Sequence, residues 1–266
     1  MIVKCFRKVG GVSASYRLLL VACFTFLAAA FTSCGGRKAK SAALAGGAPI
    51  LLFNGTGASP NDGAAVAAIM DSSHLSYTTV NSTELNGMAQ EQLLRYRLLV
   101  VPGGNFIDMG NSLKPGTAAN IRHAVQHGLN YLGICAGGFL AGKSAYYNGF
   151  NLTSGVTFGF YAAENKGVHK AVVAISSPGA PTLDQYWEGG PQLSGWGMVA
   201  AKYPDGSPAV TEGKCGSGFV ILTGIHAEAP ADWRSGMSFN TPAGIDNTYA
   251  AKLIRAALNG VLLPHY

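Results

Sequence analysis

The chain has 266 residues, enough for one sizeable domain or two small ones, and its 36 glycines suit an α/β domain with many tight loops. The formal net charge of +6 is concentrated at one end, because seven of the 19 Lys and Arg residues and no acidic residue precede residue 41. The rest of the chain is nearly neutral. This balance argues against a nucleic-acid-binding surface and makes the basic end a targeting feature.

The amino-terminal residues have the pattern of an export signal. Residues 1–17 are basic and residues 18–31 are almost wholly apolar, a length typical of signal peptides and short for a membrane span. A small residue then precedes Cys34, as in a bacterial lipoprotein cleavage box whose cysteine becomes the lipidated first residue. Phe31 departs from the aliphatic residue that is usual there, so cleavage after Ala30 and an uncleaved anchor remain alternatives.

This pattern predicts the organisation of the whole chain and its location. We expect an exported protein of the cell envelope, held at the membrane through a lipid on Cys34. The expected parts are a signal peptide over residues 1–33, a flexible tether over residues 34–47 and one domain over residues 48–266.

The first half of the domain alternates apolar strands with helices. Helices are expected at residues 62–70, 81–96 and 114–126, and they alternate with strands at residues 49–54, 75–80 and 97–102. Such alternation predicts a parallel sheet covered by helices on both faces. The loops at residues 55–60 and 102–106 and the turn at Cys135 should then meet at the carboxyl ends of the strands.

Two patterns in this half could suggest a bound cofactor or metal. Gly55 and Gly57 follow the first strand as in a dinucleotide-binding loop, but Pro60 stands in the place of the third glycine. His123 and His127 have a metal-binding spacing, but no acidic third ligand is near them in sequence. We therefore expect a loop that borders a pocket, two surface histidines, and neither a cofactor nor a metal.

Residues 129–139, LNYLGICAGGF, carry the strongest functional signal. They predict a buried strand that turns sharply into a helix, with Cys135 at the apex and small residues at Gly133, Ala136, Gly137 and Gly138. This is the mechanical arrangement of a nucleophile elbow, with sulfur in place of oxygen. The N–H groups at the start of the helix would favour the reactive thiolate.

The later half predicts short β segments among glycines. We expect β structure at residues 150–160, 171–176 and 198–203, and a loop over residues 186–191 that could cover the crevice. Residues 207–212 and 218–225 should form a hairpin with its turn at residues 214–216. Its second arm ends at His226 and Glu228, and a final amphipathic helix spans residues 247–258.

Two cysteines, Cys135 and Cys215, belong to the expected domain. An export route would allow them to form a disulfide. Cys135 follows its strand whereas Cys215 precedes the next one, so in a parallel sheet they would lie about 15–20 Å apart. A disulfide needs Cα atoms within about 7 Å. We therefore expect Cys215 to be a free, half-buried residue.

Five segments together resemble a known family. They resemble the class I glutamine amidotransferase-like superfamily, and within it the biotin-protein ligase N-terminal domain family: NGTGAS (54–59), VVPGGN (100–105), YLGICAGG (131–138), WEGGP (187–191) and GIHAE (224–228). The resemblance implies a flavodoxin-like α/β fold with a hairpin-rich C-terminal half. Ala227 departs from the proline that many relatives carry between the histidine and the glutamate.

The resemblance also implies roles for individual residues. Cys135 would attack a carbonyl carbon, His226 would move its proton, and Glu228 would orient the imidazole. The backbone N–H groups of Ala136 and of Gly103 or Gly104 would form an oxyanion hole, and Asn105 and Glu188 would line the pocket.

Two functions remain open from the sequence. One is a cysteine hydrolase or amidase whose partner is a small-molecule or peptide amide. A biosynthetic amidotransferase is not expected, since no synthetase or ammonia-acceptor domain is recognisable, and without a ligase domain biotin transfer is not implied. The other function is a non-catalytic envelope module that binds a ligand in the same pocket, because fold does not fix function and a free thiol outside the cytoplasm risks oxidation.

Overall fold

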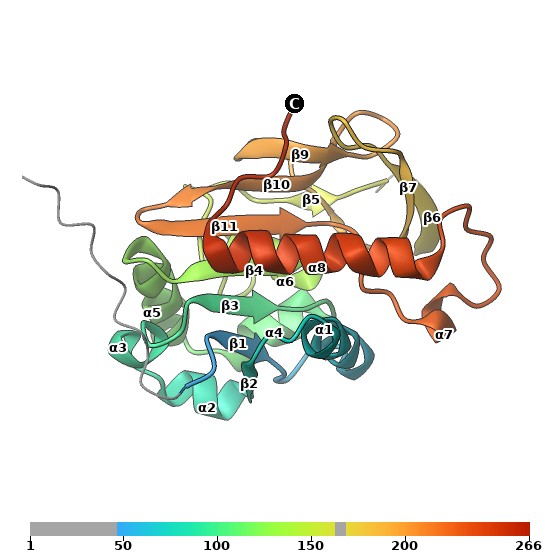
Figure 1. Cartoon of the computed structure of the whole chain (residues 1–266). Coiled ribbons are helices and arrows are strands. Elements are labelled where there is room, and N and C mark those ends of the chain that lie inside the picture. Colours follow the sequence, from blue (N-terminus) through green and yellow to red (C-terminus); the bar gives the residue numbers. More distant parts are fainter. Residues whose placement is uncertain (1–46, 163–168) are drawn as a thin grey trace, which may run out of the picture. The chain divides into compact units, whose positions relative to one another are not determined.

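The computed structural model describes residues 47–162 and 169–266, which belong to one compact unit. Its centre is a seven-stranded sheet (Figure 1). The strands run in the order β2 (Tyr77–Val80), β1 (Ile50–Phe53), β3 (Leu98–Val101), β4 (Asn130–Ile134), β11 (Gly218–Thr223), β10 (Pro208–Cys215) and β9 (Met198–Lys202). The first five strands run parallel to one another, and β10 pairs antiparallel with both of its neighbours, β11 and β9. The predicted parallel α/β sheet is confirmed.

Helices cover both faces of this sheet, which is why β1 and β3 are buried along their whole length. α1 (Pro60–Ser72) and α8 (Ala243–Asn259) pack on one face, against residues such as Leu52 and Val100. α5 (Pro115–Gln126) and α6 (Ala136–Ala141) pack on the other, against Leu51 and Leu99. Figure 1 shows α8 lying across β4 and β11.

The predicted helix over residues 81–96 is wrong in its length. The structure has two short helices, α2 (Ser82–Gly87) and α3 (Gln90–Leu93), separated at Met88, whose backbone is extended. The capping signal at Asn81 and Glu84 is confirmed, since each side chain accepts the backbone N–H of the other. Beyond Gly87 the side chain of Gln92 accepts the N–H of Ala89 and starts a second helix.

The helix that follows the PGGN loop was not predicted from the sequence. α4 (Phe106–Ser112) follows the PGGN loop directly, because the Asn105 side chain accepts the N–H groups of Ile107 and Asp108 and so caps the helix. The side chain of Asn105, which was expected to line a pocket, therefore caps the amino terminus of α4.

The later half contains less regular β structure than the sequence suggests. Of residues 150–160 only β5 (Gly159–Phe160) is a strand, and it pairs with β8 (Pro191–Gln192). β6 (Lys170–Ile175) and β7 (Leu183–Glu188) form a separate hairpin. Residues 186–188 are thus part of a strand and not of a loop, as buried Tyr186 and Trp187 require. The β10–β11 hairpin turns at residues 216–217, whereas the predicted turn was residues 214–216, because β10 extends to Cys215.

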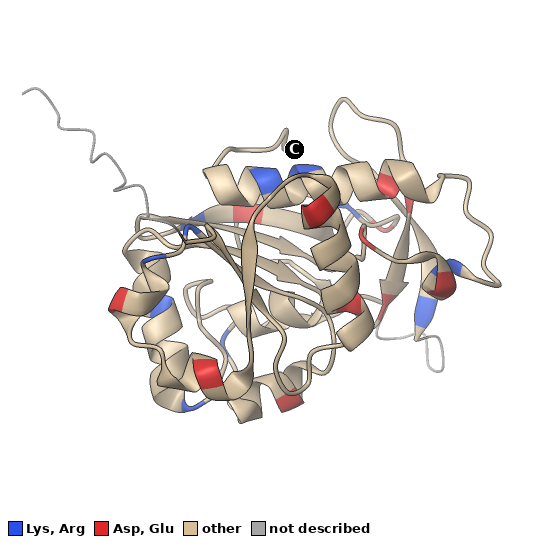
Figure 2. Cartoon of the chain, turned by 60° about the horizontal axis from the view of Figure 1, so that its bottom comes forward, with Lys and Arg blue, Asp and Glu red and all other residues tan. Residues whose placement is uncertain are grey.

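Three further predictions concern the cysteines, the distribution of charge and the amino-terminal leader. Cys135 and Cys215 are both free, as predicted. Charged residues are scattered over the face in Figure 2. Among residues 47–162 and 169–266 no helix is long and apolar enough to cross a membrane. The predicted signal peptide and nearly all of the tether, with Cys34, lie outside the described residues.

Candidate active site

Cys135 occupies the sharp turn between β4 and α6, in a backbone conformation that L-residues rarely adopt. Its φ is 47° and its ψ is −100°. A Cβ on Gly133 would lie 2.4 Å from the Gly137 carbonyl oxygen, and a Cβ on Gly137 would lie 2.1 Å from that of Val101. These glycines let strand and helix approach closely enough to force the turn. Strain held at one reactive side chain is typical of a functional site.

The end of β11 lies beside this turn. The Cys135 N–H donates to the Thr223 carbonyl oxygen at 2.8 Å, and His226 follows three residues later. The Cys135 side chain is 6% exposed, and its thiol donates to the Glu188 carbonyl oxygen at 3.6 Å. The structure therefore brings Cys135, Glu188 and the segment that carries His226 to the same end of the sheet.

His226 and Glu228 form a buried pair. Nδ1 of His226 lies 2.7 Å from Oε1 of Glu228, and both residues are 4% exposed. The backbone is held as well, since the His226 N–H donates to the Tyr186 carbonyl oxygen at 2.9 Å. This contact orients the imidazole, and within the described residues its other nitrogen, Nε2, has no hydrogen-bond partner and can exchange a proton.

A second carboxylate, which was not predicted from the sequence, completes this cluster. Asp62 is fully buried in the first turn of α1 and has Oδ1 3.6 Å from Nδ1 of His226. Its Oδ2 accepts the Gly103 N–H. The sequence signal was present but weak: an acidic residue three positions after the capping Ser59, where a helix favours negative charge.

The buried charges alter one another's proton affinities. Burial alone would lower the pKa of His226, but the negative charges of Cys135, Asp62 and Glu228 outweigh it and raise that pKa well above the usual value. Burial and the neighbouring Asp62 raise the pKa of Glu228 to about 8. Burial also works against ionised Asp62, but His226 and the Gly103 N–H hold its pKa below the ordinary value. The two carboxylates thus differ in protonation at neutral pH.

The structure distinguishes between Gly103 and Gly104 as the second predicted donor to an oxyanion hole. The Gly103 N–H is already donated to Asp62. Within the described residues the N–H groups of Gly104 and Ala136 have no hydrogen-bond partner. A side chain is excluded at Gly104, where φ is 144° and a Cβ would lie 2.2 Å from the Gly57 carbonyl oxygen. Of the predicted donors, the N–H groups of Gly104 and Ala136 are therefore the two that are still available.

The loops expected to meet at the strand ends do so. The Ser59 N–H donates to the Gly103 carbonyl oxygen at 2.9 Å, and the Asn105 N–H donates to that of Gly57 at 2.8 Å. A Cβ on Gly103 would lie 2.5 Å from Cε1 of His226, so this loop also contacts the imidazole.

Aromatic side chains surround the imidazole. The ring of Trp233 lies 5.5 Å from that of His226 and the ring of Tyr186 lies 5.9 Å from it, between centroids. Tyr186 also donates its hydroxyl to the exposed carboxylate of Glu188. Trp233 was not foreseen, because it comes from α7 (Ala231–Arg234), a short helix without a buried residue.

Asp62, His226 and Glu228 could in principle also ligate a metal ion. Ligand atoms of Asp62, His226 and Glu228 all lie within 4.8 Å of one another. However, Nδ1 and Oε1 are already at hydrogen-bond distance, and Asp62 Oδ2 accepts a backbone N–H. A shared proton fits this arrangement. His123 and His127 are exposed at the end of α5.

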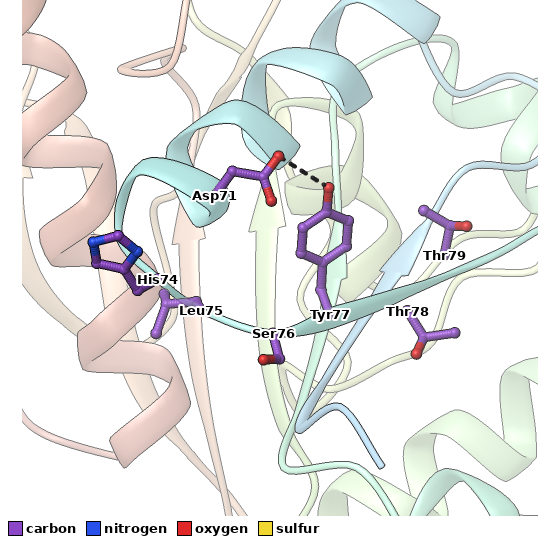
Figure 3. Close-up of a pocket in the computed structure, with 7 residues that line it drawn as sticks. All are labelled: Asp71, His74, Leu75, Ser76, Tyr77, Thr78 and Thr79. Carbon is purple, nitrogen blue, oxygen red and sulfur yellow. Dashed lines mark hydrogen bonds between the residues drawn. The ribbon is translucent and has the colours of Figure 1, made fainter. Parts of the chain in front are cut away.

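A pocket elsewhere on the molecule is unrelated to this cluster. A cavity of about 830 Å³ lies along the edge strand β2 (Figure 3) and is lined by Asp71, His74, Leu75, Ser76, Tyr77, Thr78 and Thr79. Tyr77 points its hydroxyl toward Asp71. None of the predicted site residues lines it.

Comparisons with known proteins agree with this architecture. Residues 48–169 match the family described as the N-terminal part of biotin-protein ligase. No curated protein matches the chain.

Solved structures share the fold with little sequence identity. A putative GMP synthase component from Thermoplasma acidophilum is 13% identical, with 80% of this chain and 94% of that one covered and a TM-score of 0.51. A cold-adapted β-galactosidase from Rahnella sp. R3 is 15% identical, with 82% of this chain covered and a TM-score of 0.50. The chain spans only about a third of that enzyme's length (32%). At these identities the likeness concerns the fold alone. The chain thus has a class I glutamine amidotransferase-like fold, and its residues 48–169 are similar to the biotin-protein ligase N-terminal family.

Proposed function

We propose that this protein is a cysteine hydrolase or amidase that acts on a small-molecule or peptide amide, or on a related acyl compound. Cys135 would be the nucleophile, His226 the proton carrier and Glu228 a partner that orients the ring. The observation that carries this proposal is the strained turn at Cys135, tied by a backbone hydrogen bond to the strand that leads to the His226–Glu228 pair. Strain at a thiol beside a buried base is expected of a nucleophile.

The chemistry follows from these positions. Nε2 of His226 holds the proton given up by the Cys135 thiol, as its raised pKa favours, while the sulfur bonds to the carbonyl carbon and the carbonyl oxygen takes up the negative charge. The N–H groups of Gly104 and Ala136 would stabilise that charge. The C–N bond then breaks, the amine leaves with the proton from His226, and water hydrolyses the thioester to the acid.

A second candidate is a binding module without turnover. The thiol of Cys135 donates to the Glu188 carbonyl oxygen, and its residue is only 6% exposed. This contact would have to break before the sulfur could react. A binding protein that retains the turn at Cys135 without catalysis would keep the hydrogen bond between the thiol and the Glu188 carbonyl oxygen.

The place of action is proposed from the sequence alone. Basic residues 1–17, the apolar run and Cys34 support an exported lipoprotein of the cell envelope. Labelled fatty acid should be incorporated into the full chain and lost with Cys34→Ser. Incorporation that survives this substitution would contradict the proposal.

The test of the chemical proposal is site-resolved alkylation. Iodoacetamide is added to the full chain at several pH values, and modification of each cysteine is followed by mass spectrometry. Cys135 should react at pH 7 at least about tenfold faster than Cys215, since burial raises the pKa of the Cys215 thiol. His226→Ala should slow Cys135 and leave Cys215 unchanged.

The controls separate the two candidates. Cys215→Ser removes the background thiol without touching the cluster. If Cys135 reacts slowly and is indifferent to His226→Ala, the binding module is correct and the hydrolase is not. If it is fast and depends on His226, a screen of amide substrates is the next experiment.

A further inference from the structure

The cluster around His226 contains two carboxylates, although one is enough to orient an imidazole. Glu228 makes the close contact, at 2.7 Å from Nδ1, and Asp62 Oδ1 lies 3.6 Å from the same nitrogen. Asp62 is fully buried, and its Oδ1 has no hydrogen-bond partner among the described residues. A buried carboxylate oxygen without a partner is costly unless an adjacent positive charge compensates it.

The two carboxylates are held in different environments. Asp62 accepts the Gly103 N–H and lies in the first turn of the 13-residue helix α1, and both features stabilise a negative charge. Glu228 follows the end of β11, and no backbone N–H donates to it in the described part of the chain. Because adjacent buried carboxylates do not both ionise easily, the one with the donors keeps the charge.

We propose that Asp62 is a positioning residue for the reaction assigned to Cys135, and that it, not Glu228, supplies the negative charge that stabilises the protonated His226. Glu228 then holds a proton near neutral pH and fixes the orientation of the ring through its contact with Nδ1. This inference rests on the proposed function for its catalytic meaning, but the charge arrangement itself does not depend on turnover.

The positions of the protons support these separate roles for Asp62 and Glu228. With the thiol proton of Cys135 on Nε2 of His226, the pair consists of a thiolate and an imidazolium. Asp62 already carries its charge, so no further proton has to move. The titratable groups that face His226 come from four elements: Asp62 on α1, Cys135 at the start of α6, Tyr186 on β7 and Glu228 after β11. The raised pKa of Glu228 and the lowered pKa of Asp62 agree with the assignment.

The alternative is that Asp62 only clamps the loop at Gly103. Asp62→Asn separates the two tasks, because the asparagine carbonyl can still accept the Gly103 N–H while the charge is lost. Glu228→Gln is the matched change in the other carboxylate. Asp71→Asn, on the exposed side of the same helix, is the control for a lost aspartate.

The experiment follows the ring resonances of His226 by NMR as the pH of the full chain is varied. The signal is assigned as the one missing in His226→Ala. In the unmodified protein it should titrate well above pH 6.5. Asp62→Asn should lower the midpoint by at least about one pH unit. Glu228→Gln should lower it less, and Asp71→Asn should leave it unchanged.

The outcomes decide whether Asp62 stabilises the protonated His226 by its charge or only holds the loop at Gly103 through a hydrogen bond. An unchanged midpoint in Asp62→Asn, or a larger fall in Glu228→Gln, overturns the proposal. If Asp62→Asn does not fold, the carboxyl carbons of the unmodified protein give the same answer, because Glu228 should titrate near pH 8 and Asp62 below its ordinary range. The reverse assignment overturns the proposal. Failure of the proposed function is a different result, namely alkylation of Cys135 that ignores His226→Ala.

Discussion

Two regions of the molecule are stabilised in different ways. Residues 50–141 form the doubly wound part, where β1, β3 and β4 are buried between helices and glycines allow backbones to touch. The arm at residues 230–246, which carries α7 and the start of α8, has few buried apolar side chains. There, Arg234 pairs with buried Asp246 and donates to the Thr241 carbonyl oxygen.

The difference matters because the candidate site takes residues from both regions. Cys135 and Asp62 belong to the doubly wound part, whose geometry is set by close packing. Trp233, which contacts His226, belongs to the arm. Tightly packed cores are rigid, whereas segments with few buried apolar contacts open more readily. The comparison therefore predicts a rigid turn at Cys135 and, at Trp233, a segment that opens more readily.

The largest expected effect comes from adding one methyl group to the doubly wound part. In Gly137→Ala the new Cβ would lie 2.1 Å from the Val101 carbonyl oxygen, and backbone cannot give way cheaply. The free energy of unfolding should fall by about 3 kcal/mol. Denaturant unfolding measures it.

Gly116→Ala is the matched control for that change. Gly116 holds the same position in α5 as Gly137 holds in α6, and nothing lies within 4 Å of its Cβ direction. Gly116→Ala should leave the free energy of unfolding unchanged or raise it by about 0.5 kcal/mol. Equal losses from both glycines would mean that close packing does not set the elbow.

An intermediate effect is expected in the arm. Arg234→Met leaves the Asp246 carboxylate without its positive partner and, among the described residues, with only the Gln185 amide as a hydrogen-bond donor, which should cost about 2 kcal/mol because the arm can open and admit water. Hydrogen exchange should accelerate in residues 230–246 and remain slow in β1, β3 and β4. Arg255→Met, on the exposed side of α8, is the control. A uniform loss of protection would contradict the division into two regions.

The doubly wound part could be predicted from the sequence because its signals are local. Apolar runs bounded by glycine and proline gave β1 and β3, and the Asn81–Glu84 pattern predicted where a helix begins. The break at Met88 was missed because Gln92 starts the next helix through a single side-chain contact. Such a contact leaves little trace in hydrophobic periodicity.

The later region and part of the site could not be predicted in this way. Tyr186 and Trp187 resembled loop residues, yet pairing with β6 makes them strand, and that pairing depends on partners distant in sequence. Asp62 was invisible as a site residue for the same reason. Only the folded chain brings its carboxylate to His226, which lies 164 positions later.

The smallest expected effect tests whether the elbow stores strain. Glycine tolerates positive φ and alanine does not, so Cys135→Gly should be more stable than Cys135→Ala by about 1 kcal/mol. Both variants lose the thiol, so the difference isolates the backbone. One position later the residue is helical, and Ala136→Gly should instead destabilise by about 1 kcal/mol. Opposite signs at adjacent positions, measured by denaturant unfolding, would locate the strain at the sulfur-bearing residue. If glycine were the worse choice at both positions, the turn would be relaxed, and the argument from strain to a nucleophile at Cys135 would lose its basis.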